Sequence, residues 1–202
     1  MTPRDPGAAV TLWWLPVGAG GTVVTHTSGW WESIVAHRER REPQPLFHAA
    51  LEVILDGQRH VIEMTPVVGA PRGPRGVVAT GPVGAVPLGL SAMFRYEVRR
   101  WRDGMLPDRN FAVGGPVAID MDAAPARRLL ASVPDVPRHT WGRRPRGSHD
   151  MWNSNSLISW LLEVGGVDAS RLVPPGHGRA PGWRAGIDAA RSLPRAGATP
   201  AR

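Results

Sequence analysis

The strongest constraint on the fold lies in residues 47–65, where two alternating segments flank the dipeptide Asp56-Gly57. In the first segment, Phe47–Leu55, apolar side chains recur at every second position, as in a strand that buries one face. Asp-Gly between two such segments is a strong signal for a two-residue hairpin turn. The sequence therefore predicts an antiparallel hairpin in which Leu55 faces Gln58.

This register brings three ionisable side chains to one face of the hairpin. Glu52 faces Val61, Ala50 faces Glu63 and His48 faces Thr65, so His48, Glu52 and Glu63 share a face. Glu63 is then the diagonal neighbour of His48, within reach of a side-chain hydrogen bond. A carboxylate that accepts the Nδ1 proton of a histidine leaves Nε2 free as a base. His48 is thus a candidate base, and an ordinary strand histidine is the alternative.

The remaining patterns predict an α+β protein, with an antiparallel sheet packed against a few helices. Apolar periodicity predicts helices from Asp122 or Ala123 to about Val133, and over Trp152–Val164. We expect a single domain over residues 10–191, with disordered segments at 1–9 and 192–202. Further strands are predicted at Thr11–Leu15, Thr22–His26, Gly76–Thr80, Ala92–Trp101 and Val117–Ile119.

Composition excludes several classes of protein. The chain has no cysteine, which excludes disulfides and thiolate catalysis. Its net charge is +7, and all 24 of its lysine and arginine residues are arginines, which are scattered along the chain. Glycine and proline are also abundant, and together these features are typical of a GC-rich genome. We therefore expect no nucleic-acid partner. No apolar run is long enough to span a membrane and no secretory signal is visible, so a cytoplasmic location is expected.

Four small polar residues, Asn153–Ser156, lead directly into the second predicted helix. Asparagine and serine are favoured N-caps, each stabilising a helix by about 1 kcal/mol relative to alanine, but one helix needs one cap. A helix start also presents free N–H groups that can stabilise an oxyanion. The sequence leaves two interpretations open, a helix cap and a nucleophile beside an oxyanion pocket.

Nothing in the chain predicts a metal or a cofactor. His48 with Glu52 and Glu63 contains possible metal ligands, but two carboxylates on a strand face are typical of a solvated surface. The other histidines lack metal-ligand spacing, and the glycines lack the spacing of a nucleotide-binding loop.

Asn153-Ser-Asn-Ser-Leu-Ile158 and Phe47-His-Ala-Ala-Leu-Glu52 together resemble the permuted NlpC-type papain-like hydrolases, which include the lecithin:retinol acyltransferase-like proteins. In that group a histidine strand comes first, a second strand carries a polar orienting residue, and the nucleophile opens a helix. The resemblance covers about residues 45–165 and implies a permuted papain-like fold.

The resemblance implies Ser154 as nucleophile, His48 as base and Glu63 as orienting residue. Asn153 or Asn155 would help to form the oxyanion pocket. Ser156 and Glu52 are further candidates for substrate binding.

The departure from the family lies at Ser154, where the family has cysteine. A serine is not ionised near neutral pH and needs His48 as a true general base. The expected function is a hydrolase or acyl-transfer enzyme that acts on an amide or ester of a small molecule or peptide. The alternative is a catalytically inactive relative that binds a ligand or a protein.

Overall fold

The structure, a computed structural model, describes residues 7–17, 40, 42–67, 76–106 and 109–193. The strand predicted at Thr22–His26 lies outside these residues, as do most of both predicted disordered ends. The first described strand already begins at Ala8, two positions before the predicted start of the domain.

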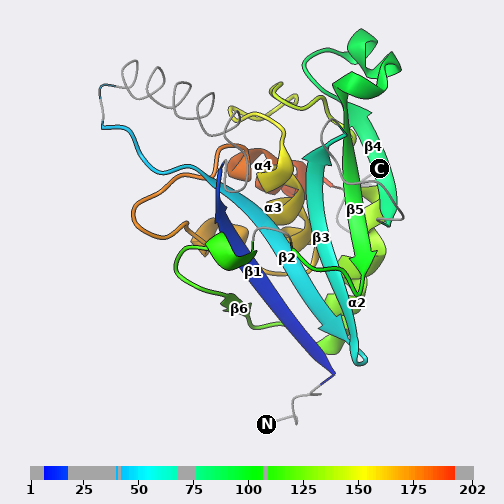
Figure 1. The fold of residues 1–202 in the computed structure, drawn as a ribbon, viewed down its shortest axis with the longest axis vertical. Coiled ribbons are helices and arrows are strands. Elements are labelled where there is room, and N and C mark those ends of the chain that lie inside the picture. Colours follow the sequence, from blue (N-terminus) through cyan, green and yellow to red (C-terminus); the bar gives the residue numbers. More distant parts are fainter. Residues whose placement is uncertain (1–6, 18–39, 41, 68–75, 107–108, 194–202) are drawn as a thin grey trace, which may run out of the picture.

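An antiparallel sheet of six strands forms the body of the described chain, in the order β4-β5-β3-β2-β1-β6 (Figure 1). Together with the helices, it confirms the predicted α+β class. The strands are β1 (Ala8–Pro16), β2 (Phe47–Leu55), β3 (Gln58–Pro66), β4 (Val77–Pro82), β5 (Arg95–Arg102) and β6 (Val117–Ile119).

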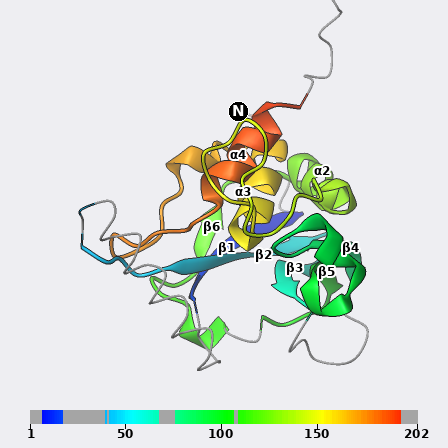
Figure 2. The ribbon, with the colours of Figure 1, turned by 90° about the horizontal axis from the view of Figure 1, so that it is seen from above.

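Three α-helices of the described chain, α2 (Ala123–Ser132), α3 (Ser154–Val164) and α4 (Trp183–Arg191), lie on one side of the sheet (Figure 2). The first two match the predicted helices to within two residues, whereas α4 was not predicted. None of the helices in the described residues is long and apolar enough to cross a membrane. Short 3₁₀ turns complete the fold: η1 (Val86–Leu90), η2 (Ala92–Phe94), η3 (Arg109–Phe111), η4 (Val133–Asp135) and η5 (Ala169–Arg171).

Alternation along the strands divides the core into two parts. The face of β2 that carries Phe47, Leu51 and Val53 packs against the helices in the main core. The opposite face, which carries Ala50, packs against Trp13 and neighbouring apolar residues in a smaller cluster. His48 is the second residue of β2, and the alternation of side chains assigns it to this second face.

The hairpin has the predicted register at its turn, where Leu55 faces Gln58 and Glu52 faces Val61. Pairing of β2 with β3 ends at Leu51 and Ile62, so the predicted pairs Ala50–Glu63 and His48–Thr65 do not form. Beyond that point β2 stays paired with β1, and β3 stays paired with β5. The two strands therefore separate beside His48, and the start of α3 fills the opening.

The strand predicted over Ala92–Trp101 begins three residues later, at Arg95. Ser91 Oγ accepts a hydrogen bond from the Met93 N–H at 3.3 Å and closes the η2 turn instead. Small polar side chains compete with strand pairing in this way. Phe94, which a strand starting at Ala92 would place on the buried face with Tyr96 and Val98, is consequently exposed.

The α4 helix forms because it packs closely against α3 through Gly186. A Cβ atom at Gly186 would lie 2.0 Å from the Ser156 carbonyl oxygen and 2.2 Å from Ser159 Oγ. Glycine weakens a helix by about 1 kcal/mol relative to alanine, so Gly186 argues against a helix when the sequence is read alone. Close packing onto a neighbouring helix offsets that loss.

We expect Gly186→Ala to lower the free energy of unfolding by about 2–3 kcal/mol, because the added methyl group meets fixed backbone. Urea denaturation measures the change. Gly165→Ala is the matched control, since its Cβ would meet the flexible end of Met121 at 2.9 Å. A stabilised Gly186→Ala variant would contradict the close α3–α4 contact.

Candidate active site

The start of α3 is held by a reciprocal pair of caps. Asn153 Oδ1 accepts a hydrogen bond from the Asn155 N–H at 2.9 Å, and the Asn153 N–H donates to Ser156 Oγ at 3.0 Å. Ser156 Oγ in turn donates to the Gly182 carbonyl at 2.7 Å. Asn153 and Ser156, predicted as oxyanion or substrate-binding residues, therefore have their polar atoms committed to the helix start.

Asn155 joins α3 to the open edge of β2. Its Oδ1 accepts from the Ala49 N–H at 2.7 Å, and its Nδ2 donates to the Phe47 carbonyl at 2.9 Å. Nδ2 also donates to the Pro181 carbonyl at 2.8 Å. The amide thus takes the place of the β3 backbone beside His48. With these bonds made, the side chain of Asn155 has no free donor for the predicted oxyanion role.

These contacts leave Ser154 facing His48. Ser154 Oγ lies 2.7 Å from His48 Nδ1, although the two residues are 106 positions apart. Ser154 is 6% exposed, and His48 is half-buried. The structure therefore brings together the predicted nucleophile and the predicted base. A histidine that accepts the serine proton at Nδ1 carries its own proton on Nε2, which is the reverse of the predicted orientation.

Burial lowers the pKa of His48 from its ordinary value of 6.5 to about 4. The cause is desolvation, which disfavours the charged imidazolium. His48 is therefore neutral at neutral pH, and its Nδ1 lone pair is available to the Ser154 hydroxyl. The same shift makes Nδ1 a weaker base than an ordinary histidine.

Glu63 does not bond to His48. It is buried on the second face of the sheet, where its Oε1 accepts from Arg99 Nη1 of β5 at 3.0 Å. No hydrogen bond joins Glu63 to His48 within the described residues. Glu63 binds Arg99 and not His48, because a charge-assisted hydrogen bond is stronger than one to a neutral imidazole.

Glu52 also lies apart from the Ser154–His48 pair. Its Oε2 is 3.8 Å from Arg109 Nη1, a long ion pair on the same second face. In the part of the chain that the structure describes, no group of metal-ligating side chains converges. His48, Glu52 and Glu63 thus share a face by parity without forming a common site.

The first turn of α3 offers one backbone donor beside Ser154 Oγ. The N–H groups of Asn155 and Ser156 are bonded to Asn153, through Oδ1 at 2.9 Å and the carbonyl oxygen at 3.0 Å. Among the described residues, the Ser154 N–H meets no acceptor. This N–H and the positive end of the helix dipole are available to negative charge at the position next to Ser154 Oγ.

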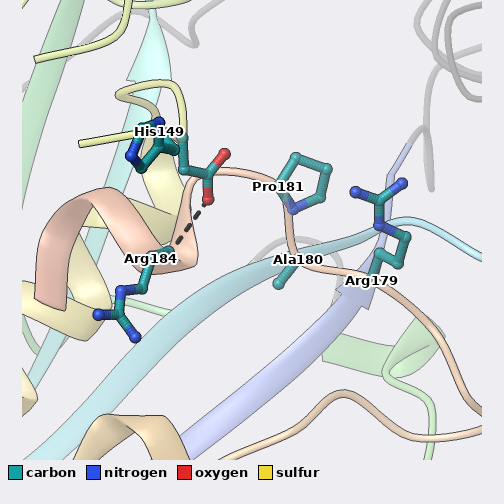
Figure 3. A pocket seen from close by; sticks show the side chains of 6 residues that line it. His149, Arg179, Ala180, Pro181 and Arg184 are labelled. Carbon is teal, nitrogen blue, oxygen red and sulfur yellow. Dashed lines mark hydrogen bonds between the residues drawn. The ribbon is translucent and has the colours of Figure 1, made fainter. Parts of the chain in front are cut away.

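A surface hollow of about 350 Å³ lies beside the Ala180–Gly182 segment (Figure 3). That volume is at the lower end of the range for small-molecule sites. Its lining residues are His149, Asp150, Arg179, Ala180, Pro181 and Arg184. One of these lining residues, Pro181, is bonded to the start of α3, because its carbonyl accepts from both Asn153 and Asn155.

Sequence reasoning missed two residues that fix this segment. Asp150 Oδ2 accepts from the Gly182 N–H at 2.8 Å and caps the start of α4. Gly182 has a φ of 89°, and a Cβ there would lie 2.2 Å from Asn153 Oδ1. The Pro181-Gly182-Trp183 sequence was the available signal for a turn at a helix start. Trp183, the first residue of α4, donates through Nε1 to the Ala169 carbonyl at 2.9 Å.

Comparison of the chain with protein-family models, curated proteins and solved structures finds no match. The resemblance to permuted NlpC-type hydrolases accordingly depends on the sequence motifs alone. The geometry of the Ser154–His48 pair is an observation of the structure that is independent of this resemblance.

We expect Asn155→Ala to lower the free energy of unfolding by about 3 kcal/mol, because it leaves buried backbone groups of β2 without partners. Hydrogen exchange of the Ala49 amide, measured by NMR, should accelerate selectively. Asn110→Ala, at an exposed asparagine, is the control and should change stability by less than about 0.5 kcal/mol. Unchanged protection at Ala49 would rule out the hydrogen bond from the Ala49 N–H to Asn155 Oδ1.

His48 should also make the protein less stable in acid. Because its folded pKa lies below its unfolded value, the unfolded chain binds the proton first as the pH falls. The contribution of His48 is complete above pH 6.5 and falls by about 3 kcal/mol towards pH 4. Urea titrations across this window should show a shallower pH slope for His48→Gln than for the wild type, while Asn110→Ala, which removes no titratable group, keeps the wild-type slope. Equal slopes for both variants would argue against a desolvated, neutral His48.

Proposed function

We propose that the chain is a hydrolase or acyl-transfer enzyme that uses a serine–histidine pair on an amide or ester. The observation that carries this proposal is the 2.7 Å contact between Ser154 Oγ and His48 Nδ1. Hydrogen bonds with the backbone already engage the other polar side chains of the segment, those of Asn153, Asn155 and Ser156. Ser154 is thereby singled out as the side chain of the polar segment that faces a base.

The reaction begins when Ser154 Oγ attacks the substrate carbonyl carbon and its proton passes to His48 Nδ1. The resulting oxyanion is stabilised by the Ser154 N–H and the N-terminal end of α3. His48 then returns the proton to the departing amine or alcohol, and an acyl group remains on Ser154. Water, or the hydroxyl or amine of an acceptor, then attacks the acyl group while His48 takes its proton. The bond between the acyl carbon and Ser154 Oγ breaks, His48 passes the proton to Oγ, and the acid, ester or amide product leaves.

The order of these elements supports a permuted papain-like arrangement. The histidine strand β2 precedes the nucleophile helix α3, as in the family that the motifs resemble. The chain departs from the family at the polar orienting residue, because Glu63 bonds to Arg99 and not to the histidine. The proposed catalytic unit is therefore a pair, with His48 oriented by the Asn155 contacts to the β2 backbone.

A non-catalytic binding protein on the same fold is the second candidate function. Burial of His48 favours this candidate, because desolvation lowers the pKa of the ring to about 4 and makes His48 a weak acceptor for a serine proton. In this alternative, Ser154 and His48 donate and accept hydrogen bonds with a bound ligand beside the hollow.

A fluorophosphonate probe distinguishes the two functions, because it reacts with an activated serine. We expect labelling of the wild type and at least a hundredfold slower labelling of Ser154→Ala and His48→Gln. The rate should fall in acid with a midpoint near pH 4, where His48 becomes protonated. Labelling is followed by intact-protein mass spectrometry.

Two controls make the result specific. Ser170→Ala removes an exposed serine and should label at the wild-type rate. Glu63→Gln should reduce the rate by less than about tenfold if His48 acts without a carboxylate, whereas a loss near 10⁴-fold would restore Glu63 as the orienting residue. A wild-type protein that never labels would favour the binding function.

A further inference from the structure

The connection between β4 and β5 carries a group of exposed apolar side chains. Its turns η1 and η2 contain no buried residue. Leu90 is 86% exposed, Val86 72% and Met93 68%, and Leu88 and Phe94 are also exposed. Soluble monomers seldom gather such side chains on one short segment unless the segment meets a partner or a membrane.

Residues 86–94 project beyond the ends of β4 and β5, at the upper right of Figure 1. We call residues 86–94 the tip. Such a projecting segment can insert into a lipid bilayer, but it offers little flat surface for contact with a folded protein. The antiparallel order places this tip at the same end of the sheet as the start of β2, which carries His48.

Two arginines donate hydrogen bonds to backbone carbonyls of the connection between β4 and β5. Arg95 donates through Nε to the Gly89 carbonyl, and Arg143 donates through Nε to the Gly84 carbonyl at 2.6 Å. Arg144 follows Arg143 and is exposed. Within the described chain, none of these three arginines pairs with a carboxylate. Their positive charge is therefore available to an anionic surface.

We propose that residues 86–94 form a docking surface for a bilayer that contains anionic lipid. Val86, Leu90 and Met93 enter the boundary between headgroups and acyl chains, and the arginines lie at the level of the negative headgroups. Apolar burial and charge attraction together give reversible attachment. This docking does not depend on the proposed enzyme activity.

Flotation of the full chain with vesicles tests the docking surface. We expect the wild type to float with vesicles of phosphatidylcholine and phosphatidylglycerol, and much less with phosphatidylcholine alone. Leu90→Ser/Met93→Ser should weaken the partition by about tenfold or more, since it removes the apolar anchors. Arg144→Gln should weaken it by about fivefold, and added salt should act in the same direction.

Met105→Ser is the matched control, because Met105 is 69% exposed but follows β5 at the opposite end of the sheet. It should float like the wild type, and circular dichroism checks that each variant is folded. Leu90→Gln alone serves as a milder second variant. The proposal is overturned if the wild type does not float with anionic vesicles, or if the double variant floats equally well. A dimer that the double variant abolishes, without any flotation, would instead assign the tip to a second copy of the chain.

Discussion

The candidate site depends on one contact, the side-chain amide of Asn155 against the edge of β2. Its oxygen and nitrogen bond to the Ala49 N–H and the Phe47 carbonyl, the backbone groups on either side of His48. Backbone groups left unpaired in the interior cost about 1–3 kcal/mol each. Because Asn155 satisfies them, β2 and β3 can separate without that loss. Asn155 is also the neighbour of Ser154, so the same contact sets the distance between Ser154 and His48.

The polar segment at the start of α3 can both cap the helix and present a reactive or ligand-binding side chain. Asn153 and Ser156 close the helix start, and Asn155 binds the strand. Ser154 takes part in none of those bonds and meets the imidazole instead. A helix start that is held at several points can present one hydroxyl in a fixed position, which is what a nucleophile or a ligand contact requires.

The charged side chains on the second face of the sheet pair with one another, away from His48. Arg99 is 3% exposed and its single guanidinium binds both Glu63 and Glu97. His48 receives no carboxylate from this network, and burial keeps its ring neutral. The chain carries an overall charge of +7, yet its candidate site is an uncharged pair.

The sequence by itself determined the hairpin, because the Asp56-Gly57 turn and the two-residue period of its arms act over neighbouring positions. It also determined the start of α3 and the α+β class, and it singled out Ser154 and His48. Only the tertiary structure decided that Glu63 pairs with Arg99, that Nδ1 faces the serine, and that α4 forms despite Gly186. Periodicity and turn chemistry are local. The partner of a buried side chain depends on which groups the folded chain brings within about 3 Å, and neighbouring residues do not encode that distance.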